Sequence, residues 1–154
     1  MTTSARLTAS SVTLAYDDRV VIEDLTLAVP DAKVTVIVGA NACGKSTLLR
    51  GLARLLKPRR GSVLLDDRSV HEMRSVDVAR VLGLLPQTPV APDGITVADL
   101  VGRGRYPHQG WFRQWRAEDD AAVASALEAT RTAGLATRHL AELSRGQRQG
   151  GWIA

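Results

Sequence analysis

The sequence has few features that point to an extracellular or membrane-embedded protein. Cys43 is the only cysteine among 154 residues, so no disulfide can form within the chain, and a reducing cytoplasm is the simplest setting. No apolar run approaches the roughly 18 to 20 residues that a membrane-spanning helix needs. Apolar residues make up 45% of the chain and charged residues 23%, which is typical of a globular domain that builds a core.

The charge pattern gives little support for nucleic-acid binding. The formal net charge is +4, but the basic residues are scattered along the chain. The one tight cluster, at 57–60, follows a run with helical spacing, where cations suit the C-terminal end of a helix. We therefore expect no nucleic-acid partner.

Residues 39–47 read GANACGKST and fit the phosphate-binding P-loop pattern G-x-x-x-x-G-K-[ST]. The β-branched run at 34–38 predicts a buried strand before the loop. Apolar residues at helical spacing over 46–56 predict a helix after it, which Pro58 ends. Strand, glycine loop and helix is the arrangement that a phosphate-binding loop requires.

This arrangement predicts a site for a polyphosphate with a magnesium ion. The backbone N–H groups of the loop and of the helix N-terminus converge on the anion. Lys45 adds a positive charge near the β- and γ-phosphates, and the Ser46 hydroxyl can ligate Mg²⁺. The predicted nucleotide-binding residues of the loop are Gly39, Ala40, Asn41, Ala42, Cys43, Gly44, Lys45, Ser46 and Thr47.

The rest of the chain reads as a sheet-forming part followed by a helical part. Alternating patterns predict a hairpin of strands at 7–15 and 20–29, joined at Asp17-Asp18-Arg19. Short strands are expected at 62–65 and, buried, at 81–86. Helices are expected at 75–80, from a capping box at Thr96 to Asp99, and at 117–130. The predicted fold class is α/β.

Four landmarks occur in a meaningful order along the chain: Tyr16, the P-loop, Gln87 and the segment LSRGQ at 143–147. A P-loop followed by an LSGGQ-like segment resembles the nucleotide-binding domain of ABC transporters. The stretch 102–108, with aromatic and acidic residues behind it, narrows the resemblance. It is similar to the ATPase subunits of bacterial ferric-siderophore importers, the catecholate (enterobactin-like) group in particular. The residues behind the stretch are Phe112, Trp115, Glu118 and Asp119.

The resemblance implies an ABC-type P-loop NTPase core with an antiparallel β subdomain and a helical insertion. The β subdomain and P-loop core would cover 1–87, the helical subdomain 88–143, and the start of the signature helix 144–154. In the family, the Walker B aspartate, the catalytic glutamate and the switch histidine follow the signature. We therefore expect the chain to be the N-terminal portion of a longer ATPase, truncated before the Walker B strand and inactive alone.

The resemblance also implies roles for individual residues. Tyr16 matches the family's aromatic residue that stacks on adenine; a tyrosine that merely ends a strand is the plain alternative. Gln87 matches the glutamine that approaches Mg²⁺ and the attacking water, so it joins Lys45 as a catalytic residue and Ser46 as a metal ligand. A surface glutamine is its alternative. The signature residues would contact the γ-phosphate of ATP held by the opposite protomer, and they are Ser144, Gly146 and Gln147.

Three departures from the family pattern carry expectations of their own. Ala42 replaces a glycine often found in the loop, which is tolerable if its backbone avoids positive φ. Arg145 replaces the first signature glycine, and its guanidinium could either hold phosphate or hinder close approach of two protomers. Gly150 and Gly151 stand inside the expected signature helix, where each costs roughly 1 kcal/mol relative to alanine.

The function implied by the resemblance is that of an ATP-hydrolysing subunit that powers import of iron–siderophore complexes across the bacterial inner membrane. Its expected partners are the permease subunits, a second ATPase protomer in a head-to-tail dimer and, indirectly, a siderophore-binding protein. The expected place is the cytoplasmic face of the inner membrane, with ATP and Mg²⁺ as cofactors. Two alternatives stay open: a nucleotide-binding fragment without turnover, and a soluble ABC-type ATPase that has no role in transport.

Overall fold

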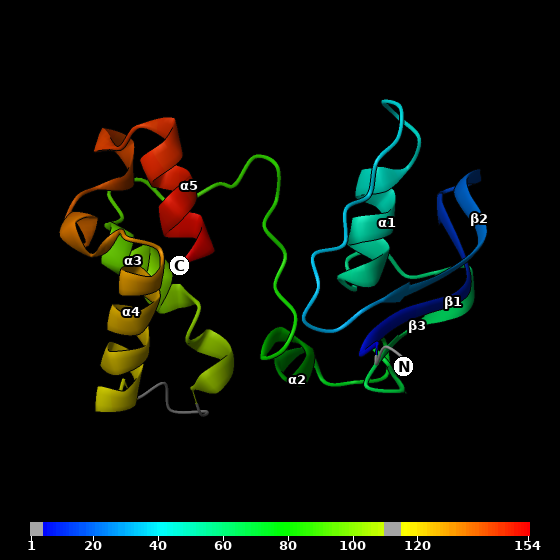
Figure 1. Cartoon of the computed structure of the whole chain (residues 1–154), viewed down its shortest axis with the longest axis horizontal. Helices are drawn as coiled ribbons and strands as arrows, with labels where there is room; N and C mark the ends of the chain where they lie inside the picture. The colour runs from blue at the N-terminus through cyan, green and yellow to red at the C-terminus, as the bar shows by residue number, and fades with distance from the viewer. Residues whose placement is uncertain (1–4, 110–114) are drawn as a thin grey trace. The chain divides into compact units, whose positions relative to one another are not determined.

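The computed structural model describes residues 5–109 and 115–154, and it divides into two compact units, Met1–Leu82 and Gly83–Ala154 (Figure 1). Phe112, which contributed to the resemblance, lies outside the described residues. Within the described ranges, no helix combines the length and the apolar character that crossing a membrane demands. Each unit has a hydrophobic core of its own.

The first unit is built on a four-stranded antiparallel sheet. Its strands are β1 (Leu7–Tyr16), β2 (Arg19–Val29), β3 (Arg60–Leu65) and β4 (Arg68–Ser69), and they lie in the order β2-β1-β3-β4. The predicted hairpin is confirmed, since β1 and β2 pair in antiparallel register with Tyr16 opposite Arg19. A two-residue turn joins them, and Asp17 takes the positive φ of 45° that such turns favour.

Helix α1 (Lys45–Leu52) packs on this sheet through Leu48 and Leu52, which join a core that includes Val12 and Val63. The contact with β1 is close: a Cβ on Gly51 would come within 2.6 Å of Leu14. The helix is shorter than predicted because Arg54 adopts a left-handed φ of 65°, a conformation that ends helices.

Two predicted buried strands, at 34–38 and 81–86, are wrong. Neither segment forms a strand, and Val34, Val36 and Val38 are 92%, 72% and 84% exposed. Only Ile37 of the first run packs against the core. A strand exists through hydrogen bonds to a neighbour, and neither run is part of a ladder in the described residues. The second run also begins inside a turn, because its first residues donate to the Val78 carbonyl at the end of α2 (Ser75–Ala79).

The second unit is helical, as predicted. Its elements are α3 (Val97–Arg103), η1 (Tyr106–His108), α4 (Ala117–Ala129), η2 (Ala133–Leu135), η3 (Leu140–Glu142) and α5 (Arg145–Ile153). The predicted capping box is confirmed: Thr96 Oγ1 accepts from the Asp99 amide at 3.1 Å, and Asp99 Oδ2 accepts from the Thr96 amide at 3.2 Å. The core gathers side chains from α3, α4 and the segments before α5: Ile95, Val97, Leu100, Val101, Leu127, Leu140 and Leu143.

The two glycines of α5 differ in their surroundings. A Cβ on Gly151 would lie 3.5 Å from a Val97 methyl, an ordinary van der Waals contact, whereas one on Gly150 would lie 3.0 Å from the methyl of buried Thr132. We expect Gly151→Ala to raise the free energy of unfolding of this unit by ~1 kcal/mol through helix propensity. Gly150→Ala should gain less or destabilise, because Thr132 must shift. Urea unfolding followed by helical circular dichroism measures both, and equal gains would contradict the packing difference.

His71 gives the first unit a pH dependence. Its Nε2 atom is buried and has no hydrogen-bond partner in the described structure. Burial first, and then the positive charges of Arg54 and Lys57, hold the pKa of His71 below its ordinary value of 6.5. Because the folded state favours the neutral ring, its stabilising contribution is present above the unfolded pKa and is lost as the pH falls through the folded one.

We therefore expect the free energy of unfolding to decline from about pH 7 to about pH 5, and His71→Gln to make this decline shallower. Urea midpoints across the range measure it. His108→Gln, at an exposed position, is the matched control and should leave the slope unchanged. A slope that is the same in all three proteins would refute the role of His71.

Candidate nucleotide-binding site

The loop at 39–44 reaches α1 through residues in unusual backbone conformations. Gly44 is the N-cap residue of α1 and has a φ of 97°. Gly39 approaches the side chain of Cys43 so closely that a Cβ there would lie 2.8 Å from its sulfur. Ala42 does not meet the condition set from the sequence, since its φ is 64°. A residue with a Cβ pays about 1–2 kcal/mol in this region, so the loop holds a strain that glycine would relieve.

The N-terminus of α1 fits a polyphosphate. No side chain caps it, and its first turn contains no acidic residue. The amide N–H groups of the first turn have no intrahelical acceptor and lie at the positive end of the helix dipole. Lys45 adds its charge here: its Nζ donates to the carbonyl oxygens of Gly39 and Ala40 at 2.8 Å and 2.5 Å. The loop therefore presents donors and a cation together, which is the chemistry that an anion with several oxygens requires.

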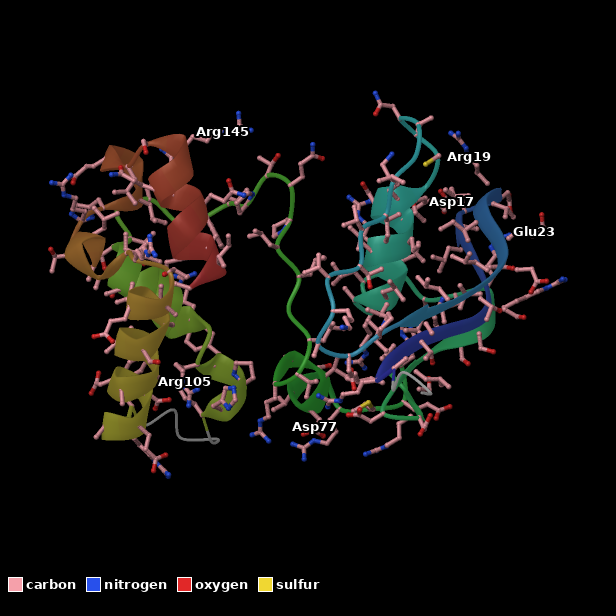
Figure 2. All side chains as sticks on the ribbon, viewed as in Figure 1. Asp17, Arg19, Glu23, Asp77, Arg105 and Arg145 are labelled. Atoms are coloured by element: carbon pink, nitrogen blue, oxygen red, sulfur yellow. The ribbon has the colours of Figure 1, made fainter. Side chains whose placement is uncertain are left out.

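A cavity of about 650 Å³ brings this loop together with the end of β1. Tyr16, which is 39% exposed, lines it alongside five of the nine predicted loop residues: Ala42, Gly44, Lys45, Ser46 and Thr47. Gly39, Ala40, Asn41 and Cys43 complete the loop but do not line the cavity. The sequence analysis did not predict the residues of the opposite wall of the cavity. The predicted hairpin turn could have indicated them, because the residues that follow Tyr16 must lie beside Tyr16. That wall comprises Asp17, Asp18, Arg19 and Val21, with Asp17 and Arg19 labelled in Figure 2.

The hydroxyl of Tyr16 is held from α1. Arg50 Nη1 donates to Tyr16 Oη at 2.9 Å. This hydrogen bond is the main cause, and one with Thr47 a second, of a pKa of Tyr16 below its ordinary value. The ring is therefore fixed at its polar end while its faces remain available beside the cavity.

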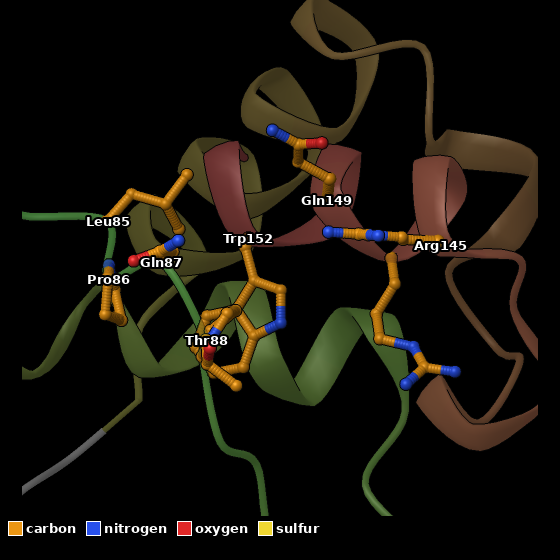
Figure 3. A pocket seen from close by; sticks show the side chains of 9 residues that line it. Leu85, Pro86, Gln87, Thr88, Arg145, Gln149 and Trp152 are labelled. Carbon is orange, nitrogen blue, oxygen red and sulfur yellow. The ribbon is translucent and has the colours of Figure 1, made fainter. Parts of the chain in front are cut away.

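Gln87 and the signature residues belong to the second unit, Gly83–Ala154. Gln87 lines a cavity of about 510 Å³ together with Arg145, Gln149 and Trp152 (Figure 3). No cluster of three or more histidine, cysteine or carboxylate side chains exists in the described residues. The two predicted magnesium ligands, the Ser46 hydroxyl and the Gln87 amide, belong to different units, and each offers a neutral oxygen.

The signature residues form the start of α5. Ser144 is its N-cap, and Ser144 Oγ accepts from the Gln147 amide at 3.3 Å while Gln147 Oε1 accepts from the Ser144 amide at 3.0 Å. Gly146 is exposed, and a Cβ there would meet nothing within 4 Å. Arg145 is the first residue of the helix, is exposed, and lines the cavity that Gln87 shares.

The fold and the loop identify the class of protein. Residues 22–154 match the ABC transporter family, which the chain therefore belongs to. Among solved structures, MJ1267, an ATP-binding cassette of an ABC transporter, has a TM-score of 0.78 at 24% identity, covering 98% of this chain and 64% of that one. At this identity the likeness shows the fold, which is that of an ABC ATPase.

The most informative relatives are siderophore import proteins. The ferric enterobactin transport ATP-binding protein FepC of Escherichia coli (strain K12) is 50% identical over 150 residues, which are 97% of this chain and 55% of FepC. The achromobactin transport ATP-binding protein CbrD of Dickeya dadantii (strain 3937) is 49% identical over 96% of this chain and 55% of CbrD. The petrobactin import ATP-binding protein FpuD of Bacillus anthracis is 47% identical over 96% and 54%. The chain spans about half the length of these curated relatives.

Cys43 reports directly on the loop. It is exposed, and its sulfur lies 3.7 Å from Lys45 Nζ. We expect maleimide to label Cys43 in the free protein and MgATP to slow the labelling, because a bound polyphosphate would cover the loop. Mass spectrometry measures the rate without ambiguity, since the chain has one cysteine. In the Lys45→Ala control, labelling should proceed at the same rate with and without MgATP. The same equality in the unmodified chain would contradict the occlusion.

Proposed function

We propose that this chain binds MgATP at the P-loop and Tyr16, and that the protein it belongs to is an ATPase. Hydrolysis would power import of iron–siderophore complexes across the bacterial inner membrane. The observation that carries the proposal is the cavity that joins Tyr16 to an uncapped helix N-terminus and its lysine. The cargo class rests on the relatives, whose names specify enterobactin, achromobactin and petrobactin transport.

Binding would rest on charge and position. The amide N–H groups of the first turn of α1 would donate hydrogen bonds to the phosphate oxygens in place of solvent, and Lys45 would transfer its hydrogen bonds from the Gly39 and Ala40 carbonyls to phosphate. Tyr16 offers a ring face to adenine, an interaction that any purine can make. Bound Mg²⁺ would neutralise phosphate charge, with the Ser46 hydroxyl as the P-loop group that holds it, and Gln87 of the second unit stays a predicted ligand.

We propose that the start of α5 acts on ATP held by a second protomer. The amides at the N-terminus of α5 and the Ser144 hydroxyl suit a γ-phosphate, as do those of α1. Gly146 leaves room for close approach because it is exposed and carries no side chain. Two such half-sites require a head-to-tail dimer. The exposed Arg145 would stand at that interface, where its charge favours phosphate.

The permease contact is proposed for residues 105–108. Arg105 Nε donates to Asp119 Oδ1 at 2.8 Å, and this bridge is mostly buried, so it fixes the segment against α4. Tyr106 and Trp115 line a cavity of about 650 Å³ in this unit. An exposed aromatic residue on a fixed segment is suited to bind a helix of a membrane partner. The subunit would then lie at the cytoplasmic face of the membrane, acting with a siderophore-binding protein only through the permease.

The proposal depends on Lys45. We expect Lys45→Ala to reduce affinity for MgATP about tenfold or more, because a charge-assisted contact to phosphate is lost. Isothermal titration calorimetry on the 154-residue chain measures this. Lys33→Ala, at an exposed lysine in a turn, is the matched control for loss of one positive charge. ATP binding of unchanged affinity in the Lys45 variant would refute the site, and transport by the whole protein should fail in parallel.

A further inference from the structure

Arg50 stands outside the P-loop pattern and outside the residues that line the P-loop cavity. It lies one helical turn beyond Thr47 on α1, and its side chain is exposed. In the described part of the chain, the hydrogen bond to Tyr16 is the one side-chain interaction that the structure gives its guanidinium. A long, flexible cationic side chain at the surface is usually solvated, because ordering it costs conformational entropy. The 2.9 Å hydrogen bond from Arg50 to Tyr16 is therefore a feature to explain.

We propose that Arg50 is a positioning residue for the nucleobase: it anchors the hydroxyl of Tyr16 so that the ring is held ready to stack on adenine. The inference rests on the proposed function, because it requires that the cavity binds a nucleotide. The inference adds Arg50 to the proposed nucleotide-binding site, as a residue that does not contact the nucleotide. Arg50 acts on the base through Tyr16, and it has no direct part in holding phosphate.

The geometry supports an anchor that is rigid at both ends. Arg50 is followed by Gly51, whose missing side chain lets α1 approach buried Leu14 of β1. Leu14 lies two residues before Tyr16 on the same strand. Helix and strand are therefore locked together directly beside the Arg50–Tyr16 hydrogen bond. The distance between the two residues is set by core packing rather than by flexible loops.

The anchor matters because Tyr16 is exposed at the end of a strand, and its hydroxyl is held mainly by Arg50, with a second hydrogen bond to Thr47. Its ring is 39% exposed at the end of β1, where the chain turns. A ring that can rotate loses side-chain entropy when it stacks on a base, and a ring held beforehand loses less. The lowered pKa of Tyr16 agrees with a hydroxyl that is bonded to a cation. Fixing the polar end leaves the faces of the ring free for stacking.

The test separates binding of the base from binding of the phosphates. Calorimetry on the 154-residue chain compares MgATP with magnesium tripolyphosphate, which has no base. We expect Arg50→Met to weaken MgATP binding about three- to tenfold and to leave tripolyphosphate unchanged, because a hydrogen bond from a charged donor is lost. Tyr16→Phe keeps the ring but loses the anchored hydroxyl, so it should have the same effect.

The double variant Arg50→Met/Tyr16→Phe should be no weaker than Tyr16→Phe alone, since the loss of the Tyr16 hydroxyl already removes the bond from Arg50 together with that to Thr47. Arg50→Lys should recover part of the affinity, and the pKa of the Tyr16 phenol should rise in Arg50→Met. Arg68→Met, at an exposed arginine of β4, is the control for loss of one charge. Should Arg50→Met fail to fold, as judged by circular dichroism, Tyr16→Phe still tests the anchor.

Three results would overturn the inference. Equal weakening of MgATP and tripolyphosphate would show that Arg50 acts through its charge on the phosphates. Additive losses in the double variant would show that Arg50 acts independently of Tyr16. Full affinity in both single variants would show that the anchor is not needed. If the unmodified chain has no Lys45-dependent binding of MgATP, the proposed function itself fails, and the inference fails with it.

Discussion

The structure of the first unit is organised around a helix end that the helix cannot satisfy by itself. The amides at the N-terminus of α1 have no intrahelical acceptors, no side-chain cap and no neighbouring carboxylate in the first turn. Three features near this end add positive character or remove bulk, although Asp17 and Asp18 also line the cavity. Lys45 is held on the loop carbonyls, Gly44 takes a left-handed conformation, and the cavity opens at the end of β1. The proposed anion site therefore combines unsatisfied backbone donors with the charge of one side chain, Lys45.

The same helix also fixes the aromatic side of the cavity. Core packing of α1 on β1 through Leu48 and Leu14 sets the position of the helix relative to the strand. Tyr16 ends that strand and receives the Arg50 hydrogen bond. The packing of α1 on β1 therefore positions both the loop proposed to bind phosphate and the tyrosine proposed to face the base. A similar helix end occurs in the second unit, at the N-terminus of α5. There Ser144 and Gln147 satisfy two of the backbone amides through a capping box and leave the other amides of the first turn without such a partner.

Features that depend on local sequence could be predicted, and features that depend on distant partners could not. The hairpin turn and the capping box at Thr96 are decided by residues within four positions of one another, and both are confirmed. The P-loop could be found from its pattern, although the positive φ of Ala42 could not. The strand at 34–38 is expected from β-branched content and the one at 81–86 from a short apolar run, but either pattern indicates a preference and supplies no neighbouring strand. The Arg50–Tyr16 bond joins residues 34 positions apart, and no local pattern predicts it.

The run at 34–38 has a consequence for how the protein behaves in solution. Val34, Val36 and Val38 are exposed, and the backbone between them has no ladder partner in the described residues. A β-branched segment of this kind is a template on which another copy of the same segment can form a strand. Such pairing is second order in protein, so colloidal stability would fall with concentration even where each molecule remains folded. Storage of the 154-residue chain at low concentration should then limit this self-association.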